Sequence, residues 1–332
     1  MKISLAVIYG GQGREHEVSV MGFKSLSQMI RKEKYKLHEI FIDKSGAWYY
    51  IHGDESYPTF PVRLGGKRGF LVSGRIIPCD IAFPLLHGDM GEDGNIQGLL
   101  TSVGIPFVGE GTRTGALTSD KAYTKIIAES VGVPTVRSVT LFKLPTEEAA
   151  EKIEREIGYP VFIKPASLGS SFGASGAASR DELAGAYGLA ASLDERVLAE
   201  ELVSPKRELE CAVLKTGDGF VITPPSEIII SGEYGYNEKY KGGTPLRVSA
   251  DVSEEIASTL RGYCGRLIDA LGIESMSRID FFLSGDRIFF NEINSMPGFT
   301  KDSLYVRMLE GVGIASCEVI DILVANAVEK GR

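Results

Sequence analysis

The sequence predicts an α/β protein of two to three domains in which strands and amphipathic helices alternate along the chain. Its 332 residues suffice for that many domains. A short apolar strand, a glycine pair and a helical pattern begin the chain, and the alternation continues to about residue 202. We expect a parallel α/β domain in residues 1–110, a small central α/β domain in residues 111–202 and an α+β domain in residues 203–332.

In the first domain the apolar runs are short and bounded by glycine, proline or charged residues, as buried strands are. Helical spacing separates them at two places. The expected strands are residues 3–11, 36–42, 80–86 and 105–109, and the expected helices are residues 17–32 and 94–104. A parallel sheet flanked by helices fits this order best.

The second domain continues the alternation on a smaller scale. Ser119 is the expected N-cap of its first helix. The expected helices are residues 120–132, residues 145–157 and a segment after Ser179, and the expected strands are residues 135–142, 159–166 and 196–202.

The third domain combines strands with one clear amphipathic helix, Ser253 to Leu271. The expected strands are residues 208–214, 220–230, 277–283 and 287–293. The apolar side chains expected on one face of the helix are Ile256, Leu260, Cys264, Leu267, Ile268 and Leu271.

Composition excludes several classes of function. The chain has 36 basic and 44 acidic residues, a net charge of −8, which disfavours a general nucleic-acid surface because phosphate binding relies on clustered lysine and arginine. The basic residues within 65–70 are expected in a solvated loop. Signal-peptide and membrane-span patterns are not found, which favours the cytoplasm. The widely spaced cysteines are expected to be reduced core thiols: Cys79, Cys211, Cys264 and Cys317.

The most informative segment is Ser277 to Gly298, which contains two apolar strands joined near residues 284–286. Alternation predicts that the polar side chains of both strands share one surface. With a three-residue loop, Asp280 lies opposite Phe290, and Arg278 lies opposite Glu292. A loop one residue shorter or longer would move one set to the other face.

Asp280, Glu292 and Asn294 would then form an all-oxygen site suited to Mg²⁺. The alternative is a surface ion pair between Arg278 and Glu292 with a solvated Asp280. The aromatic and branched neighbours imply burial, and buried carboxylates need a cation or hydrogen-bond donors.

Two lysines and two glycine-containing loops complete the candidate site. Lys121 begins a helix, and Lys164 ends a buried strand just before "GSSFG", whose backbone N–H groups could cover a phosphate or form an ordinary turn. The loop "GGQGREHE" follows the first strand but lacks the third glycine of a dinucleotide site, where His16 stands. Glu15 in that loop would suit an amine.

Taken in order, the motifs "GGQGREHEVS", "PLLHGDMGEDGNIQG", "SDK", "FIKPASLGSSFG", "EYGYNEKY", "SRID" and "NEINSMPGFT" resemble those of the D-alanine:D-alanine ligases of the ATP-grasp superfamily. The resemblance covers essentially the whole chain and implies the ATP-grasp fold. It implies that ATP phosphorylates one D-alanine and that the amine of a second displaces phosphate. The product is a dipeptide for peptidoglycan, and therefore for cell-wall biogenesis and cell shape.

The resemblance also assigns residues. It implies catalytic roles for Glu15, Ser170, Arg278, Gly298 and Tyr240. It implies ATP contacts by Lys121, Lys164, Ser171, Glu200, Glu201, Leu202, Glu208 and Lys239. It implies substrate contacts by Glu15, His87, Ser303 and Leu304, and metal ligation by Asp280, Glu292 and Asn294. ATP and two Mg²⁺ ions are the expected cofactors, Mn²⁺ can substitute, and a cytoplasmic homodimer is expected.

Some positions depart from the family's pattern. Glu233 stands where an aromatic residue is usual, and Lys301 and Asp302 stand where serine and histidine are usual. The second pair leaves D-alanine:D-serine ligase as an alternative. A non-catalytic ATP-binding regulatory module is a further alternative, although a metal ligand or Arg278 would then be missing. A depsipeptide ligase is disfavoured because "NEKYKGG" has no histidine.

Overall fold

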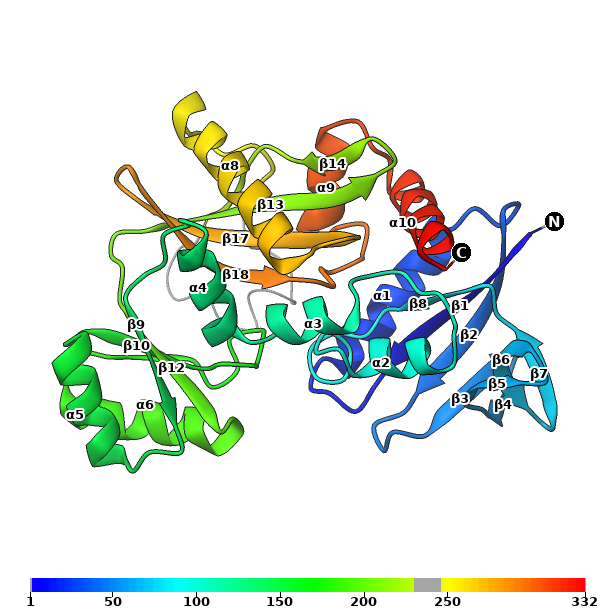
Figure 1. The fold of residues 1–332 in the computed structure, drawn as a ribbon, viewed down its shortest axis with the longest axis horizontal. Coiled ribbons are helices and arrows are strands. Elements are labelled where there is room, and N and C mark those ends of the chain that lie inside the picture. Colours follow the sequence, from blue (N-terminus) through cyan, green and yellow to red (C-terminus); the bar gives the residue numbers. More distant parts are fainter. Residues whose placement is uncertain (1, 230–245, 332) are drawn as a thin grey trace.

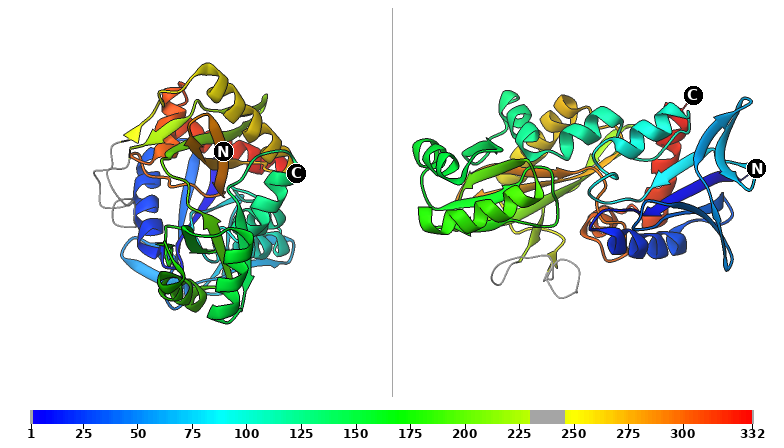
Figure 2. Two further views of the ribbon diagram at one scale, coloured as in Figure 1. Left: turned by 90° about the vertical axis from the view of Figure 1, so that its left-hand side faces the viewer. Right: turned by 90° about the horizontal axis from the view of Figure 1, so that it is seen from below.

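The computed structural model describes residues 2–229 and 246–331 and shows a mixed α/β protein, as predicted. Figure 1 shows the N-terminal sheet on the right and a small unit with β9, β10 and β12 at the lower left. The sheet with β13, β17 and β18 lies above. Seen from below, this third sheet lies between the other two (Figure 2).

The N-terminal sheet has the strand order β4-β3-β2-β1-β8. Its central strands β2, β1 and β8 are parallel, as predicted, whereas β3 and β4 add an antiparallel edge that the sequence pattern did not reveal. The strands are β1 (Ile3–Gly10), β2 (Tyr35–Ile42), β3 (Trp48–His52), β4 (Glu55–Pro58) and β8 (Ile81–Pro84). The expected helices are α1 (His16–Met29) and α2 (Asn95–Ser102).

Two expectations for this region are wrong. Residues 105–109 form no strand, and Phe107 makes only an isolated bridge to Ala82. Residues 67–70 lie in a strand rather than a loop, because Phe70 is buried and anchors an additional antiparallel sheet of order β5-β6-β7. Its strands are β5 (Pro61–Leu64), β6 (Lys67–Val72) and β7 (Arg75–Pro78).

The small unit is an antiparallel sheet of order β11-β10-β12-β9, with α5 and α6 packed on it. Its elements are β9 (Ser138–Phe142), α5 (Thr146–Glu156), β10 (Val161–Pro165), β11 (Ser175–Ala177), α6 (Arg180–Leu193) and β12 (Arg196–Glu201). Two helices precede it, α3 (Thr112–Thr118), which was not predicted, and α4 (Lys121–Ser130). The predicted N-cap Ser119 is wrong: the Asp120 carboxylate accepts the N–H groups of Ala122 and Tyr123.

The third sheet has the order β16-β15-β13-β17-β18, with β14 paired to β13. Its strands are β13 (Arg207–Thr216), β14 (Gly219–Ile222), β15 (Ser226–Ile228), β16 (Leu246–Arg247), β17 (Met276–Ser284) and β18 (Arg287–Asn294). The predicted amphipathic helix is α8 (Glu254–Leu271), with Ser253 as its N-cap. Its predicted apolar face is buried against this sheet, except that Ile256 is partly buried.

The C-terminal helices α9 (Leu304–Gly311) and α10 (Ser316–Lys330) were not predicted. Their buried side chains share one core with β1, β8 and β13, which fastens the N-terminal sheet to the third sheet. Within the described ranges, no single helix is long and apolar enough to cross a membrane. The bent pair of α9 and α10 reaches that length and composition only when both helices are taken together.

A buried carboxylate reinforces this attachment. Glu110, which is 2% exposed, accepts hydrogen bonds from the backbone N–H groups of Glu274, Ser275 and Met276 at 2.7, 3.0 and 3.0 Å. These N–H groups lie just before and at the start of β17, the strand that carries Arg278 and Asp280. Glu110 therefore sets the position of this strand relative to the N-terminal part of the chain.

Candidate active site

The hairpin of β17 and β18 brings the predicted polar residues onto one face, although by a different register from the predicted one. The turn has two residues, Gly285 and Asp286, so that Phe281 lies opposite Phe290. A β-bulge then shifts the pairing by one residue and places Asp280 opposite Glu292. The predicted pairing of Asp280 with Phe290 is therefore wrong, but the shared face survives because the bulge compensates for the shorter turn.

Arg278 is the centre of this face. Its Nε and Nη2 donate to the two oxygens of Asp280 at 2.8 and 2.7 Å, and its Nε lies 3.1 Å from Glu210 Oε2. Asn294 Nδ2 also donates to Asp280 at 3.1 Å. Burial opposes the charge of Arg278, but Asp280 and Glu210 outweigh it and hold the arginine pKa well above its usual value. The arginine therefore stays charged.

Lys121 lies beside the same face. Its Nζ is 3.4 Å from Glu292 Oε2 and donates to the carbonyl oxygen of Leu168 at 2.7 Å. Asp120 caps α4, so that Lys121 is the first residue of this helix. Lys121 N also donates to Ala166 O at 2.9 Å.

Lys164 lies on β10 of the small antiparallel sheet and forms part of a buried charged group. Its Nζ is 2.8 Å from Glu200 Oε2 and 3.3 Å from Asn291 Oδ1, where Asn291 is the residue before Glu292. Lys125 Nζ is 2.8 Å from the other oxygen, Glu200 Oε1. Burial raises the pKa of Glu200, but the two lysines outweigh it and bring the pKa down to about 2.

The loop Gly169 to Gly173 reaches across to the N-terminal part of the chain. Ser170 and Ser171 both have left-handed backbone conformations, with φ of 53° and 58°. Ser170 Oγ hydrogen-bonds to Glu15 Oε1, and the Arg14 guanidinium lies 5.6 Å from the centre of the Phe172 ring. The loop connects β10 to β11 and contacts the Glu15 segment, and its covering of a phosphate stays a prediction.

Glu15 is held by the turn between β1 and α1. Ser19, which is fully buried, accepts the N–H of Gly10 at 2.8 Å and donates to the carbonyl oxygen of Leu85. This bond fastens the Glu15 turn to the segment that carries His87. Ser19 was not among the predicted site residues, and its only signal in the sequence is a hydroxyl residue in the first helix after a glycine pair.

His87 is buried, and its Nδ1 lies 3.1 Å from the carbonyl oxygen of Met296. Burial lowers its pKa, and the nearby Glu15 acts in the opposite direction without reversing the shift. The imidazole is therefore neutral. Since Met296 precedes Gly298 by two residues, His87 connects the Glu15 segment to the loop after β18.

The predicted second-substrate residues lie at the start of α9. Ser303 Oγ accepts the N–H of Thr300 at 2.9 Å and lies 2.8 Å from the Thr300 hydroxyl oxygen, while Leu304 is buried at the helix start. A helix N-terminus of this kind favours a carboxylate. Lys301 and Asp302 are exposed, and the Lys301 backbone N–H donates to Ser25 Oγ at 3.0 Å.

The remaining predicted residues are less closely grouped. Glu201 forms an exposed ion pair with Arg137 at 2.8 Å, Leu202 is 39% exposed, and Glu208 lies 3.0 Å from Lys206. They lie on β12, β13 and the segment between these strands. Of the other predicted residues, Lys239, Tyr240 and Glu233 lie outside the described residues.

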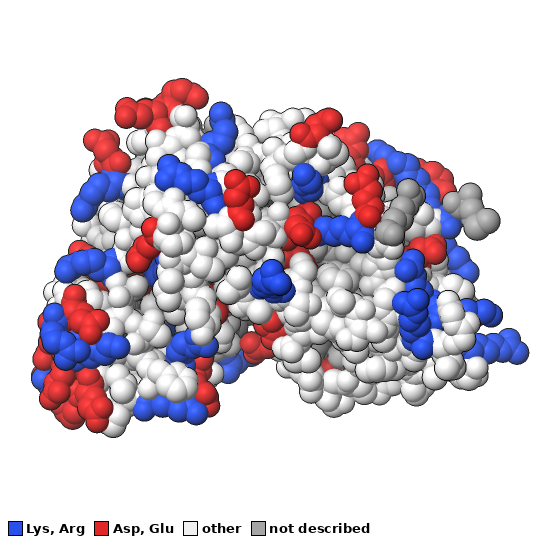
Figure 3. Space-filling model, in the orientation of Figure 1, with Lys and Arg blue, Asp and Glu red and all other residues white. Residues whose placement is uncertain are grey.

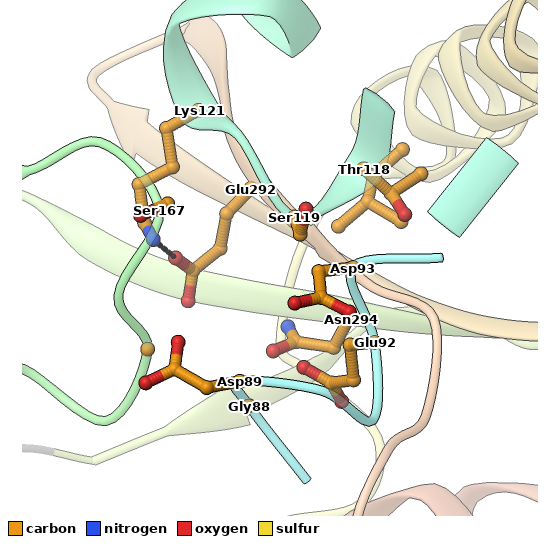
Figure 4. A pocket seen from close by; sticks show the side chains of 12 residues that line it. Gly88, Asp89, Glu92, Asp93, Thr118, Ser119, Lys121, Ser167, Glu292 and Asn294 are labelled. Atoms are coloured by element: carbon orange, nitrogen blue, oxygen red, sulfur yellow. Dashed lines mark ion pairs between the residues drawn. The ribbon is translucent and has the colours of Figure 1, made fainter. Parts of the chain in front are cut away.

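A pocket of about 100 Å³ lies between the 88–94 loop, the start of α4, residues 167–169 and the end of β18. Figure 4 shows Lys121 with Glu292 on one side, Glu92, Asp93 and Asn294 on the other, and Asp89 below Glu292. The three acidic residues from the 88–94 loop were not among the predicted site residues, although they lie in the motif "GDMGEDG". Burial, followed by the charge of Glu15, raises the pKa of Glu92 to about 8, so that its carboxyl is mainly protonated at pH 7.

The predicted cation ligands are Asp280, Glu292 and Asn294. Among the described residues, no group of at least three His, Cys, Asp or Glu side chains is arranged to hold a metal. The predicted set has two carboxylates and one amide, all on one sheet face, and this is a donor set that Mg²⁺ accepts. Two lysines lie beside it, Lys121 at Glu292 and Lys164 at Asn291.

Comparisons with known proteins show the family to which the chain belongs. The family model described as D-ala D-ala ligase N-terminus matches residues 4–110, and that described as D-ala D-ala ligase C-terminus matches residues 127–325. The D-alanine--D-alanine ligase of Caldicellulosiruptor bescii is 37% identical and is aligned over 100% of this chain and 96% of its own length. The chain belongs to the D-alanine--D-alanine ligase family.

Solved structures of this family place the fold as ATP-grasp, as predicted. The D-Ala:D-Ser ligase VanG of Enterococcus faecalis superposes with a TM-score of 0.90 at 33% identity, covering 98% of this chain and 100% of that chain. The D-alanine-D-alanine ligase of Coxiella burnetii gives a TM-score of 0.89 at 29% identity, covering 99% of this chain and 95% of that chain.

Among relatives compared by sequence alone, the D-alanine--D-alanine ligase of Deinococcus radiodurans is 36% identical over 99% of this chain and 100% of its own length.

Proposed function

We propose that this family member joins two D-alanine molecules in an ATP-dependent reaction that supplies a dipeptide for peptidoglycan. The observation that carries the proposal is the single face formed by Arg278, Asp280, Glu292 and Asn294, with Lys121 beside it and the Glu15–Ser170 contact beyond. This arrangement offers cations for phosphates, oxygens for a metal and a carboxylate for an ammonium group. We further propose that the enzyme acts on these small substrates in the cytoplasm and that it is a homodimer.

In the first step, the carboxylate of one D-alanine attacks the terminal phosphorus of ATP, and ADP leaves. Glu15 would bind the ammonium group of this D-alanine, with Ser170 holding the Glu15 carboxylate in place. Lys121 and Lys164 would bind phosphates as point charges, with Ser171 in the covering loop. Asp280, Glu292 and Asn294 would hold Mg²⁺, or Mn²⁺ in its place, which neutralises charge on the phosphates.

In the second step, the amine of the second D-alanine attacks the acyl phosphate, inorganic phosphate leaves and an amide bond forms. Arg278 and the N–H of Gly298 would stabilise the negative oxygen of the tetrahedral intermediate, each donor contributing about 3 kcal/mol. Ser303 and Leu304 at the start of α9 would bind the second carboxylate, with His87 nearby. The loop at Ser170 would exclude water, which would otherwise hydrolyse the acyl phosphate.

The nucleotide would lie between the small antiparallel sheet of β9 to β12 and the sheet that contains β13, β17 and β18. Glu201, Leu202 and Glu208 lie at the ends of β12 and β13, where they could contact adenine and ribose. We also propose roles for Lys239 and Tyr240 in closing the site, although both lie outside the described residues.

A second candidate, D-alanine:D-serine ligase, is favoured by the similarity to the D-Ala:D-Ser ligase of Enterococcus faecalis. Lys301 and Asp302 are exposed beside Ser303, so neither side chain is committed to the protein interior. The residues of the metal and Arg278 face are all present, which argues against a non-catalytic ATP-binding module.

One assay separates these candidates. Phosphate release from ATP is measured with D-alanine, D-serine and D-lactate, each alone and in pairs, and the products are identified by mass spectrometry. The proposal expects D-alanyl-D-alanine as the main product, with D-alanine alone sufficient. A chain that releases phosphate only when D-serine is added would be a D-alanine:D-serine ligase, and no release with any pair would refute a ligase function.

A further inference from the structure

Lys125 has no role in the proposed reaction, yet it is one of the most deeply buried charged side chains of the described chain. Its side chain is 3% exposed and lies 2.8 Å from Glu200, whose side chain is equally buried. Lys125 follows Lys121 by four residues on α4, so both lysines lie on the same side of this helix. A buried lysine of this kind must be matched by a carboxylate, because isolated buried charges are costly.

Glu200 is shared by two lysines. Its Oε1 faces Lys125 and its Oε2 faces Lys164, each at 2.8 Å. At 2.8 Å, the Lys125 contact is a direct attraction between opposite charges in a buried setting. Lys164 reaches further, to Asn291 Oδ1 at 3.3 Å, next to the proposed metal ligand Glu292.

The charges of this group determine what Lys164 can offer to a phosphate. Lys164 and Glu200 alone would have a net charge of zero. The Glu200 carboxylate, 2.8 Å from the Lys164 ammonium nitrogen, would then cancel most of the electrostatic field of that lysine. Adding Lys125 gives the group a net charge of +1. We propose that Lys125 is a positioning residue that neutralises Glu200 and thereby preserves the positive charge of Lys164 for the nucleotide phosphates.

This inference rests on the proposed function and changes one part of it. The resemblance assigns Glu200 to ATP binding, but both carboxylate oxygens face lysines and the side chain is buried. We therefore expect its carboxylate to act on ATP through Lys164 rather than by direct contact with adenine. Besides Glu200, the charged groups that act on Lys125 are Lys164, which lowers the Lys125 pKa, and Glu129, which raises it.

The test measures nucleotide binding without amino acids, so that it is independent of peptide formation. Isothermal titration of the full chain with Mg²⁺-ADP and with adenosine separates phosphate recognition from base recognition. Because one charge is lost close behind a phosphate, Lys125→Met should weaken ADP binding about ten- to a hundredfold. Adenosine has no phosphate, so its affinity should change less than about twofold.

The decisive variant is Lys125→Met combined with Glu200→Gln. It restores the net charge of +1 through Lys164, so ADP affinity should return to within about threefold of wild type. Glu200→Gln alone should bind ADP no more weakly than wild type and should leave adenosine binding unchanged. Lys143→Met is the matched control, because Lys143 forms an exposed pair with Glu195 at 2.5 Å.

Three outcomes would overturn the proposal. Unchanged ADP binding in Lys125→Met would show that the charge does not reach the phosphates. Equal weakening in the single and double variants would show a purely structural role. Weaker adenosine binding in Glu200→Gln would restore the direct adenine contact. If Lys125→Met does not fold, Glu200→Gln and Lys125→Arg, which keeps the charge and should bind ADP normally, still decide between these views. Failure of ADP binding in the wild type would instead refute the proposed function.

Discussion

Replacing Ser19 with alanine should destabilise the protein and loosen the turn that carries Glu15. The Ser19 side chain is fully buried on α1, accepts the N–H of Gly10 and donates to the carbonyl oxygen of Leu85. Alanine has the same backbone preference for a helix or a better one, so helix propensity does not oppose the test. The variant removes only the hydroxyl group.

The magnitude follows from the two groups left without a partner. A buried hydrogen bond contributes about 0.5 to 1.5 kcal/mol, and a buried donor or acceptor left unpaired costs about 1 to 3 kcal/mol. Allowing for relaxation and for helix propensity, Ser19→Ala should lower the free energy of unfolding by about 2 to 4 kcal/mol. With an unfolding entropy of about 2.1 cal/mol/K per residue, this corresponds to a melting temperature lower by about 3 to 6 °C.

The assay compares melting temperatures of wild type, Ser19→Ala and the control Ser27→Ala, and then the KM for D-alanine. Ser27 is on the same helix, but its hydroxyl makes only an exposed bond to Lys24 O, so its replacement should have little effect. KM for the first D-alanine should rise in Ser19→Ala while KM for ATP stays nearly constant. If Ser19→Ala melts within about 1 °C of Ser27→Ala, the burial argument for the two orphaned groups is wrong.

Other predictions address charge and catalysis. Burial, with Lys36, lowers the pKa of His38 to about 4, so the unfolded chain takes up a proton near pH 6.5 that the folded protein excludes. The free energy of unfolding is therefore unaffected by this group above pH 6.5 and falls as the pH is lowered toward 4, by about 2 kcal/mol at pH 5. In thermal melts, the decrease in melting temperature between pH 7.5 and pH 5 should be smaller for His38→Asn than for wild type. Arg278→Lys should lower kcat about a hundredfold with KM for ATP nearly unchanged, and a large rise in KM for ATP would contradict the oxyanion role. Asp321 lies 2.5 Å from Arg31 and Lys34 and 2.6 Å from Tyr35. Asp321→Asn should cost about 1 to 2 kcal/mol in melts at low salt, less at high salt, and salt-independent loss would count against an electrostatic cause.

The face in Figure 3 shows acidic and basic side chains interspersed, most densely over α5 and α6 at the lower left. The surface is hollowed at the lower centre, where acidic side chains border the recess. The net charge of −8 disfavours a general nucleic-acid surface. The basic residues proposed to bind charged substrates, Lys121, Lys164 and Arg278, instead lie in the interior.

Many elements could be predicted because backbone geometry sets their period. The strand β1, the helix α8 with its apolar face and the hairpin of β17 and β18 all follow from spacing of apolar residues. The antiparallel edge of the N-terminal sheet and the helices α9 and α10 were missed, since short or continuously buried segments carry no clear period. The family motifs identified the candidate residues without their distances.

The sequence by itself determined that Arg278 and Asp280 share one face of their strand and that Glu292 and Asn294 share one face of theirs. The reason is that side chains two residues apart on a strand point to the same face. Only the tertiary structure decided that the two pairs meet, since the shorter turn required a bulge to restore their common face. It also decided that Ser170 reaches Glu15 and that Lys125 shares Glu200 with Lys164. Such contacts join residues far apart in the chain, so they depend on how separate sheets and helices pack, which local periodicity does not encode.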